Sequence, residues 1–376
     1  MRWETSRFVR SAVALGVTLA AATVASAEER HHAVFVMTND ADSNEVIGYE
    51  RTDIGTLVNP QRFKTQGRGS GGTVDPLGSQ GSLTLSQDRS LLFAVNAGSG
   101  TVSVFRVDGA RLELTDVAPI EGSEPNAVAQ HGDLVYVLDT AGSSNVVGFH
   151  VSDEGKLKPI RNSVRRLSGN GVASASIAFS PDGRVLLVTE RATSQIDAFL
   201  VLADGTLSAI KENASAGPGA FAVTFAPSGA ALVSETGPGA ANASAISSYS
   251  VGVDGTLVPI SASVPTLGTA NCWNAVTPDG RFAYTSNAGS STISGFAISA
   301  AGALSALPGT VLGINAGGAT NIDIAISADG HFLYSLNAKA GSIGVFAIAP
   351  AEGTLTNLGA VSGLPAASGL NGIAAN

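Results

Sequence analysis

The chain has 376 residues and a net charge of −9, and 14% of its residues are charged. An acidic chain without a Lys/Arg cluster lacks the electrostatic footprint of a nucleic-acid-binding protein. Its 45 glycines follow no collagen-like period, which is typical of many strands joined by tight turns. The single cysteine, Cys272, excludes an internal disulfide.

Residues 1–27 have the pattern of a secretory signal peptide. Arg2, Arg7 and Arg10 precede a largely apolar run over residues 12–24, and the small residues Ala25-Ser26-Ala27 offer a cleavage site. That run is too short for a comfortable membrane span, and no later segment is long and apolar enough to cross a bilayer. We therefore predict cleavage after Ala27, a secreted or periplasmic mature chain over residues 28–376, and no membrane span.

From Ala33 onward a unit of turn, strand, turn and strand repeats along the chain. Dipeptides such as Asp182-Gly183 and Asp204-Gly205 predict hairpin turns, because Gly adopts a positive φ without steric cost. An apolar strand follows and ends on a polar residue. The seven strand-end residues, which lie 43 to 57 residues apart, are Asn39, Asn96, Asp139, Glu190, Glu235, Asn287 and Asn337.

The two ends of the chain complement each other. The C-terminal residues Gly372-Ile373-Ala374-Ala375 match the strand that precedes each turn, whereas the first repeat begins with the strand that follows it. We therefore predict an all-β fold, a seven-bladed β-propeller of four-stranded antiparallel blades. The C-terminal strand would join the N-terminal blade and close the ring, which removes an otherwise open seam. A closed ring needs no partner, so we expect a monomer.

Three groups of residues carry a resemblance to a known family. Ser180-Pro181-Asp182-Gly183-Arg184, the segment 284–289 and Asp254-Gly255-Thr256-Leu257 resemble the seven-bladed lactonase propellers. That family includes a propeller 6-phosphogluconolactonase and the carboxy-cis,cis-muconate cyclase, a lactone-forming enzyme. Thr189-Glu190-Arg191, Ser234-Glu235 and Cys272-Trp273 are similar to segments of a secreted bacterial branch of that family. The resemblance implies the propeller fold and chemistry on a lactone.

The strand-end positions predict a site at one mouth of the central channel. Glu190 and Glu235 depart from the usual Asn in adjacent blades, so we expect their carboxylates to approach each other. Such a pair raises one pKa and suits acid–base catalysis. Arg191 could bind a substrate carboxylate or an oxyanion. An ion pair between Glu190 and Arg191 without a catalytic role is the alternative.

Further residues could line the same mouth. Trp273 and Asp323 replace small residues in the innermost strands, where Trp273 with Asn271 could wall a ligand pocket and Asp323 could add a carboxylate. Asn287 and Asn39 are strand-end candidates for substrate binding. Packing between blades explains Trp273 equally well, and an Asn that closes a turn with its own side chain explains Asn287.

We expect no cofactor and no metal, because no His falls at the predicted mouth. A Ca²⁺ ion held by the acidic mouth stays an alternative. The Gly-rich segment 66–72 is interpreted as a lid over the mouth. The favoured function is hydrolysis or lactonising isomerisation of a small lactone or carboxylated organic acid. The alternative is a non-catalytic extracytoplasmic propeller that binds a ligand or a protein.

Overall fold

The computed structural model describes Met1, Trp3 and residues 32–120, 122 and 124–376. Contacts within the chain separate Met1–Arg30 from His31–Asn376, and the fold described below is that of the second unit. Apart from Met1 and Trp3, the predicted signal peptide lies outside the described residues. The described residues form strands and turns, and no helix among them is long and apolar enough to cross a membrane.

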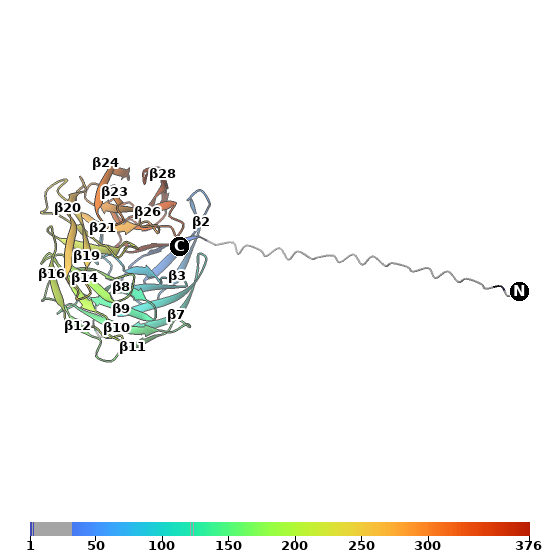
Figure 1. The fold of residues 1–376 in the computed structure, drawn as a ribbon, viewed down its shortest axis with the longest axis horizontal. Helices are drawn as coiled ribbons and strands as arrows, with labels where there is room; N and C mark the ends of the chain where they lie inside the picture. Colours follow the sequence, from blue (N-terminus) through green and yellow to red (C-terminus); the bar gives the residue numbers. More distant parts are fainter. Residues whose placement is uncertain (2, 4–31, 121, 123) are drawn as a thin grey trace. The chain divides into compact units, whose positions relative to one another are not determined.

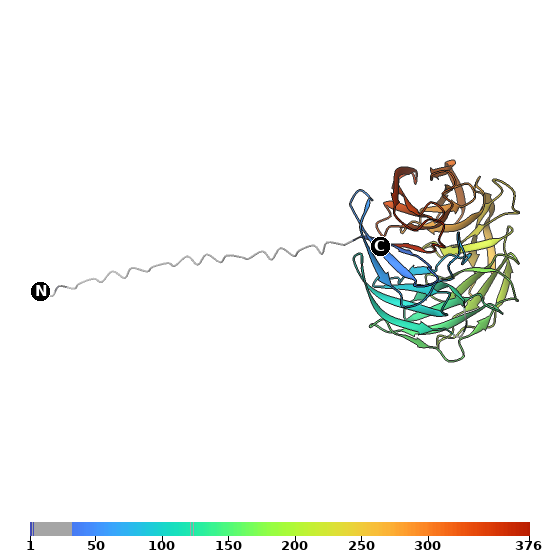
Figure 2. The same ribbon diagram turned by 180° about the vertical axis from the view of Figure 1, so that it is seen from behind.

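The second unit is a ring of seven antiparallel sheets, which confirms the predicted propeller. Figures 1 and 2 show the sheets following one another around the ring in chain order. From the innermost strand outward, blade 1 contains β29 (Ile373–Ala375), β1 (Ala33–Met37), β2 (Glu45–Arg51) and β3 (Leu57–Lys64). Blade 2 contains β4 (Leu83–Leu85), β5 (Leu91–Asn96), β6 (Thr101–Asp108) and β7 (Arg111–Pro119).

The remaining blades repeat this order. Blade 3 contains β8 (Pro125–His131), β9 (Leu134–Asp139), β10 (Asn145–Val151) and β11 (Leu157–Pro159), and β12 (Arg165–Arg166) also pairs with β10. Blade 4 contains β13 (Ser174–Phe179), β14 (Val185–Glu190), β15 (Gln195–Leu200) and β16 (Lys211–Ala214), and blade 5 contains β17 (Ala220–Phe225), β18 (Ala231–Glu235), β19 (Ala245–Val251) and β20 (Leu257–Pro265). Blade 6 contains β21 (Asn271–Val276), β22 (Phe282–Asn287), β23 (Thr292–Ile298) and β24 (Leu304–Ile314), and blade 7 contains β25 (Asn321–Ile326), β26 (Phe332–Asn337), β27 (Ser342–Ile348) and β28 (Leu355–Ser362).

The C-terminal strand closes the ring as predicted. Strand β29 pairs antiparallel with β1, and the register places Val34 opposite Ala375 and Val36 opposite Ile373. Both views show the blue N-terminal strands beside the red C-terminal ones. Burial is greatest in the second strands and lowest in the outermost ones: every residue of β1 and β5 is buried, whereas half of β3 and most of β28 is exposed. The second strand of each blade is buried on both faces because neighbouring blades cover it, and its first residues are apolar whereas its last residues are polar in several blades.

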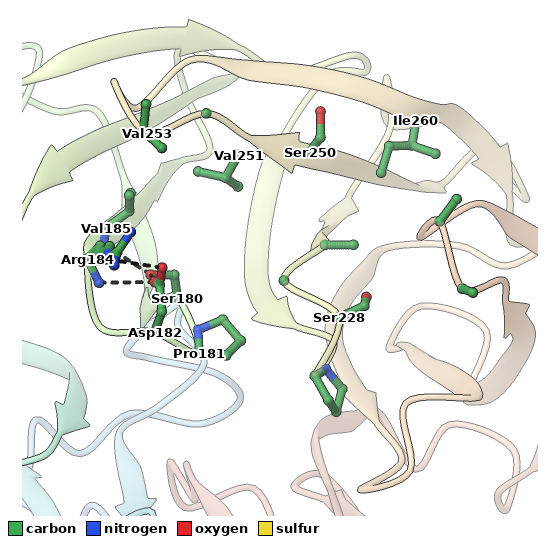
Figure 3. Close-up of a pocket in the computed structure, with 16 residues that line it drawn as sticks. Ser180, Pro181, Asp182, Arg184, Val185, Ser228, Ser250, Val251, Val253 and Ile260 are labelled. Carbon is green, nitrogen blue, oxygen red and sulfur yellow. Dashed lines mark hydrogen bonds and ion pairs between the residues drawn. The ribbon is translucent and has the colours of Figure 1, made fainter.

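The space between blades also forms open cavities. One of about 560 Å³ lies among turns of blades 4, 5 and 6 (Figure 3). Arg184 and Asp182 on its rim pair with each other at 3.6 Å, and Val251, Val253 and Ile260 supply apolar walls. Its charged groups therefore neutralise one another within one turn.

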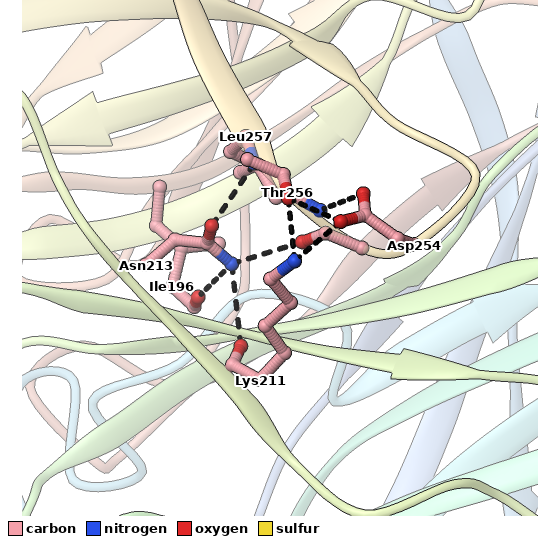
Figure 4. A network of polar contacts seen from close by, with 7 residues as sticks. Ile196, Lys211, Asn213, Asp254, Thr256 and Leu257 are labelled. Atoms are coloured by element: carbon pink, nitrogen blue, oxygen red, sulfur yellow. Dashed lines mark hydrogen bonds and ion pairs between the residues drawn. The ribbon is translucent and has the colours of Figure 1, made fainter.

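Polar contacts join neighbouring blades at the outer strands. In Figure 4, Lys211 of blade 4 reaches Asp254 in a turn of blade 5, with 2.6 Å between Nζ and Oδ2. The Lys211 hydrogen bond lowers the pKa of Asp254. Asn213 accepts a hydrogen bond from the backbone N–H of Leu257 at 2.9 Å. These contacts explain why the Asp-Gly-Thr-Leu turn recurs: its polar groups meet the preceding blade.

Buried tyrosines join blades in the same way. The hydroxyls of Tyr136, Tyr284 and Tyr334 donate to the carbonyls of Gly205, Gly353 and Gly55, each in a turn of the following blade. We expect Tyr284→Phe to lower the free energy of unfolding by about 1 kcal/mol, because the Gly353 carbonyl loses its donor. Urea unfolding measures this. Tyr49→Phe is the matched control, since no hydrogen bond of the Tyr49 hydroxyl occurs among the described residues. Equal losses in both variants would contradict the interpretation.

Candidate functional site

The innermost strands are irregular at the ends nearest the strand-end residues. Pairing with the second strand skips one residue in blades 3, 4, 6 and 7, and the skipped residues are Asn126, Ala175, Cys272 and Asp323. A β-bulge bends the strand and re-aims the side chain of the extra residue. The backbone carbonyls of two of these residues, Asn126 and Ala175, accept hydrogen bonds from the segment that fills the channel.

Residues 73–82, which we call the axial segment, belong to the connection between blades 1 and 2. They cross the central channel of the ring. The Gln80 backbone N–H donates to the Ala175 carbonyl of blade 4 at 2.9 Å. The Gln80 side chain pairs with the backbone of Asn274 in blade 6 through two hydrogen bonds of 2.8 and 3.0 Å. Ser79 donates from its hydroxyl to the Asn126 carbonyl of blade 3 at 2.7 Å. The axial segment is thus clamped by blades on several sides of the axis.

Two cavities lie on either side of the axial segment. The mouth cavity, of about 240 Å³, is lined by Asp75, Pro76, Leu77, Gly78, Glu124, Asn126, Thr140, Ala173, Ser174 and Arg191. Thr140 and Arg191 directly follow strand ends, so this is the predicted mouth. The second cavity, of about 340 Å³, extends from Asp323 to the turn at Ser86, Gln87 and Arg89 on the opposite face.

Asp75 and Arg191 give the mouth cavity its chemistry. Burial raises the pKa of Asp75 to about 7, although the Asn371 amide and the Arg191 charge oppose this rise. Asp75 has a φ of 45°, in the left-handed region, and such backbone strain is often found at functional sites. The exposed Arg191 guanidinium lies over the Phe221 ring, 5.9 Å from its centroid. Among the described residues Arg191 forms no ion pair, so it can bind an anion.

Asp323 lies on the other side of the axial segment. Its side chain is 3% exposed and accepts hydrogen bonds from the backbone N–H groups of Ile324 at 2.9 Å and Ile373 at 3.1 Å. Burial, with a smaller contribution from the Asp75 charge, raises the pKa of Asp323 to about 7, although the two backbone hydrogen bonds oppose this rise. The axis therefore holds two carboxyl groups whose pKa values are both raised to about 7.

The two predicted glutamates bind backbone and hydroxyl groups inside the fold. Both are fully buried. Glu190 accepts from the Ser168 N–H at 3.0 Å and from two hydroxyls, those of Ser168 and Thr193. Glu235 accepts from the Gly217 N–H at 2.9 Å and from the Ser263 hydroxyl at 2.8 Å. Neither residue lines the mouth cavity, whereas the neighbouring Arg191 does.

The predicted substrate-binding residues are also occupied by contacts within the fold. Trp273 is 1% exposed, packs edge-on against Phe221 and donates from Nε1 to the Ser79 carbonyl at 2.9 Å. Asn271 donates to the Ala245 carbonyl at 2.6 Å, and Asn287 donates to the Ser294 hydroxyl at 2.9 Å. These contacts are structural, and none of the three residues lines the mouth cavity.

Asn39 and the Gly-rich segment bind each other. Asn39 accepts from the Ser70 N–H at 3.0 Å and donates to the Gly369 carbonyl at 3.1 Å. A Cβ on Gly69 would lie 2.1 Å from the Asn39 carbonyl carbon, so only glycine fits there. Segment 66–72, interpreted as a lid, is therefore tied to the ring by side-chain and backbone contacts.

The remaining candidates are a nucleophilic thiolate at Cys272 and a bound metal ion. The Cys272 side chain is buried, and burial raises its thiol pKa, so the thiolate nucleophile is disfavoured. No group of three or more His, Cys, Asp or Glu residues suited to a metal ion occurs in the part of the chain that the structure describes.

Asp75 and the axial segment were missed by the sequence analysis. A signal was present in the spacing of the repeat. The interval between Asn39 and Asn96, at 57 residues, is the longest between successive strand ends. The extra residues lie in the connection between β3 and β4, which contains the axial segment.

Comparison with known proteins agrees with this architecture. The family model described as a seven-bladed β-propeller lactonase matches residues 42–172 and 274–367. Similar solved structures include a candidate 6-phosphogluconolactonase from Bacteroides uniformis, with a TM-score of 0.70 and 19% identity over 93% of this chain and 100% of that one. The periplasmic gluconolactonase of Pseudomonas aeruginosa superposes with a TM-score of 0.68 and 18% identity, over 91% of this chain and 99% of its own.

No curated protein matches the sequence. At such low identities the solved structures show the fold alone, whereas the family model covers more than half of the chain. The chain therefore belongs to the seven-bladed β-propeller lactonase family.

Proposed function

We propose that the protein hydrolyses a small lactone in the mouth cavity. The observation that carries this proposal is that Asp75, whose pKa is raised to about 7, lines the same cavity as Arg191, which forms no ion pair with any described residue, in a lactonase-family propeller. A base that titrates near the working pH is efficient in proton transfer. The acid–base role predicted for Glu190 and Glu235 passes in this proposal to Asp75.

The proposed reaction uses water and needs no redox partner. The Asp75 carboxylate takes a proton from a water molecule, whose oxygen attacks the lactone carbonyl carbon. The Arg191 guanidinium stabilises the resulting oxyanion. The carbonyl re-forms as the bond from that carbon to the ring oxygen breaks. The leaving alkoxide then takes the proton from Asp75, and the product is an open-chain hydroxy acid.

The charges of the cavity favour an uncharged polyhydroxylated lactone as substrate. Two carboxylates, those of Asp75 and Glu124, face one guanidinium in the lining. A sugar phosphate would bring two negative charges to a lining whose own net charge is negative. The similar structure from Pseudomonas aeruginosa is called a gluconolactonase, and gluconolactone is an uncharged polyhydroxylated lactone of this class.

We expect Arg191→Gln to lower kcat/KM for glucono-1,5-lactone by about 10²-fold, the typical cost of one oxyanion donor. A pH-indicator assay of acid release measures this. Arg281→Gln is the matched control, because Arg281 is an exposed arginine that pairs with Asp279 at 3.0 Å in a turn away from the mouth cavity. Equal rates for both variants would overturn the assignment of Arg191. Binding without turnover by the wild type would favour the ligand-binding alternative.

We also propose that the protein acts outside the cytoplasm as a monomer, in the manner of the secreted branch. The charge and hydropathy pattern of residues 1–27 supports export. Mass spectrometry of the protein recovered from the cell exterior or periplasm should give a mature N-terminus at Glu28. Light scattering should give the mass of one chain.

A further inference from the structure

The C-terminal segment that closes the ring also reaches the axial segment. The Gly369 N–H donates to the Thr73 carbonyl at 3.0 Å, and the Gly372 carbonyl accepts from the Met37 N–H at 3.1 Å. Gly369 has a φ of 87°, and a Cβ there would lie 2.6 Å from the Gly71 oxygen. The backbone of residues 369–372 is therefore held between β1 and the start of the axial segment.

Asn371 touches both ends of the axial segment. Its side chain is 1% exposed. Its Nδ2 donates to Asp75 Oδ1 at 3.1 Å, and its Oδ1 accepts from the Ser82 hydroxyl at 3.0 Å. A carboxylate only accepts hydrogen bonds and the hydroxyl can donate, so this amide orientation satisfies both partners. One amide thus bridges Asp75 and Ser82.

We propose that Asn371 is a positioning residue, which holds the Asp75 carboxylate on the floor of the mouth cavity and couples its placement to closure of the ring by β29. The catalytic part of this inference rests on the proposed function. The structural part, that Asn371 keeps the axial segment closed over the channel, does not.

The charged and titratable groups around Asp75 come from several blades. Arg191 of blade 4 stabilises its ionised form, as does the hydrogen bond from Asn371. Asp323 of blade 7 and Cys272 of blade 6 are both close enough to sense its charge. Glu124 lines the same cavity. Removal of the amide donor raises the pKa of Asp75, because the ionised carboxylate loses a hydrogen bond.

Asn371→Ala tests the inference with two independent measurements. The first is the rate at which a chromogenic disulfide reagent labels Cys272, which is buried beside Asp75. We expect labelling to be about 10- to 100-fold faster, the change that follows from loss of one hydrogen bond to a charged group. The second is the acidic inflection of kcat/KM against pH for glucono-1,5-lactone, which should rise by about one pH unit.

The matched control is Asn315→Ala. Asn315 is a buried amide that accepts from the Ser335 hydroxyl at 3.0 Å, and its backbone N–H donates to Ser291, so its hydrogen bonds go to blades 6 and 7 and not to the axial segment. It should leave both measurements as in the wild type. Labelling and inflection unchanged in Asn371→Ala would overturn the inference. If that variant does not fold, Ser82→Ala opens the other end of the bridge, and unchanged labelling there overturns it as well.

Failure of the proposed function is distinguishable from failure of this inference. A wild type that hydrolyses no lactone, together with faster Cys272 labelling in Asn371→Ala, removes the proposed function and leaves the bridge intact. A wild type that is active, together with an unaltered Asn371→Ala variant, removes the bridge and keeps the function.

Discussion

Asp75→Asn should lower the rate of lactone hydrolysis by about 10²–10⁴-fold, the usual contribution of a general base. Asparagine has nearly the same shape and can still accept the hydrogen bond from Asn371 through its Oδ1. It cannot accept a proton from water at neutral pH. The loss should appear in kcat, since the proton moves in the transition state.

The pH dependence of the wild type provides a second check on Asp75. Because its pKa is raised to about 7 and the base acts in its ionised form, kcat/KM should rise with pH through neutrality and then level off. The control for the rate loss in Asp75→Asn is Asp133→Asn, since Asp133 is an exposed aspartate that pairs with His150 at 2.9 Å. A full rate in Asp75→Asn would show that another group takes the proton.

Asp197→Ser should make the protein more stable at alkaline pH. Asp197 is fully buried in β15, and its two oxygens have no hydrogen-bond donor among the described residues. Burial, and then the neighbouring Glu190, raise the pKa of Asp197 to about 9. The serines Ser103, Ser247 and Ser294 each hydrogen-bond the strand-end residue of their own blade. A protonated Asp197 takes the place of such a serine beside Glu190.

The direction in which stability changes with pH follows from the number of protons that the folded and unfolded states bind. An unfolded Asp ionises near its ordinary pKa of about 3.9, so between about pH 4 and pH 9 the folded protein binds one more proton than the unfolded chain. Stability therefore falls with rising pH by about 1.4 kcal/mol per pH unit from this residue. In Asp197→Ser this contribution to the pH dependence of stability is absent.

Urea unfolding at pH 6, 7.5 and 9 measures the difference for Asp197. The free energies of the wild type and of Asp197→Ser should diverge as pH rises, with the variant more stable at pH 9. Parallel curves would mean that Asp197 is ionised in the native protein.

The architecture could be predicted from local patterns because a propeller repeats one unit. Turn dipeptides such as Asp182-Gly183 and the apolar strands after them act over a few residues, and seven copies reinforce one another. The match between the C-terminal residues 372–375 and the inner strands predicted ring closure, which the pairing of Val36 with Ile373 confirms. The mouth position of Arg191 followed from the same alignment.

The roles of the glutamates could not be predicted in this way. Alignment placed Glu190 and Glu235 at strand ends, but the direction of each side chain depends on what lies beside it. Ser168 and Gly217, in connections that precede the innermost strands, supply N–H donors that hold these carboxylates inside the fold. The repeat places each strand-end side chain beside this connection, against one of its glycines in blades 2, 3, 5 and 6. It does not show which backbone donors a carboxylate meets there, because the connections lie outside the repeated strands.

The sequence by itself determined the all-β propeller, its seven blades and the closure of its ring, since these depend on periodicity and turn chemistry. Tertiary structure alone decided that residues 73–82 cross the axis and that Asp75 meets Arg191 and Asn371 there. Asp75 lies 116 residues before Arg191 and 296 before Asn371 in the chain. Their meeting depends on the path of a non-repeating connection, and burial at the axis then raises the pKa of the carboxyl group.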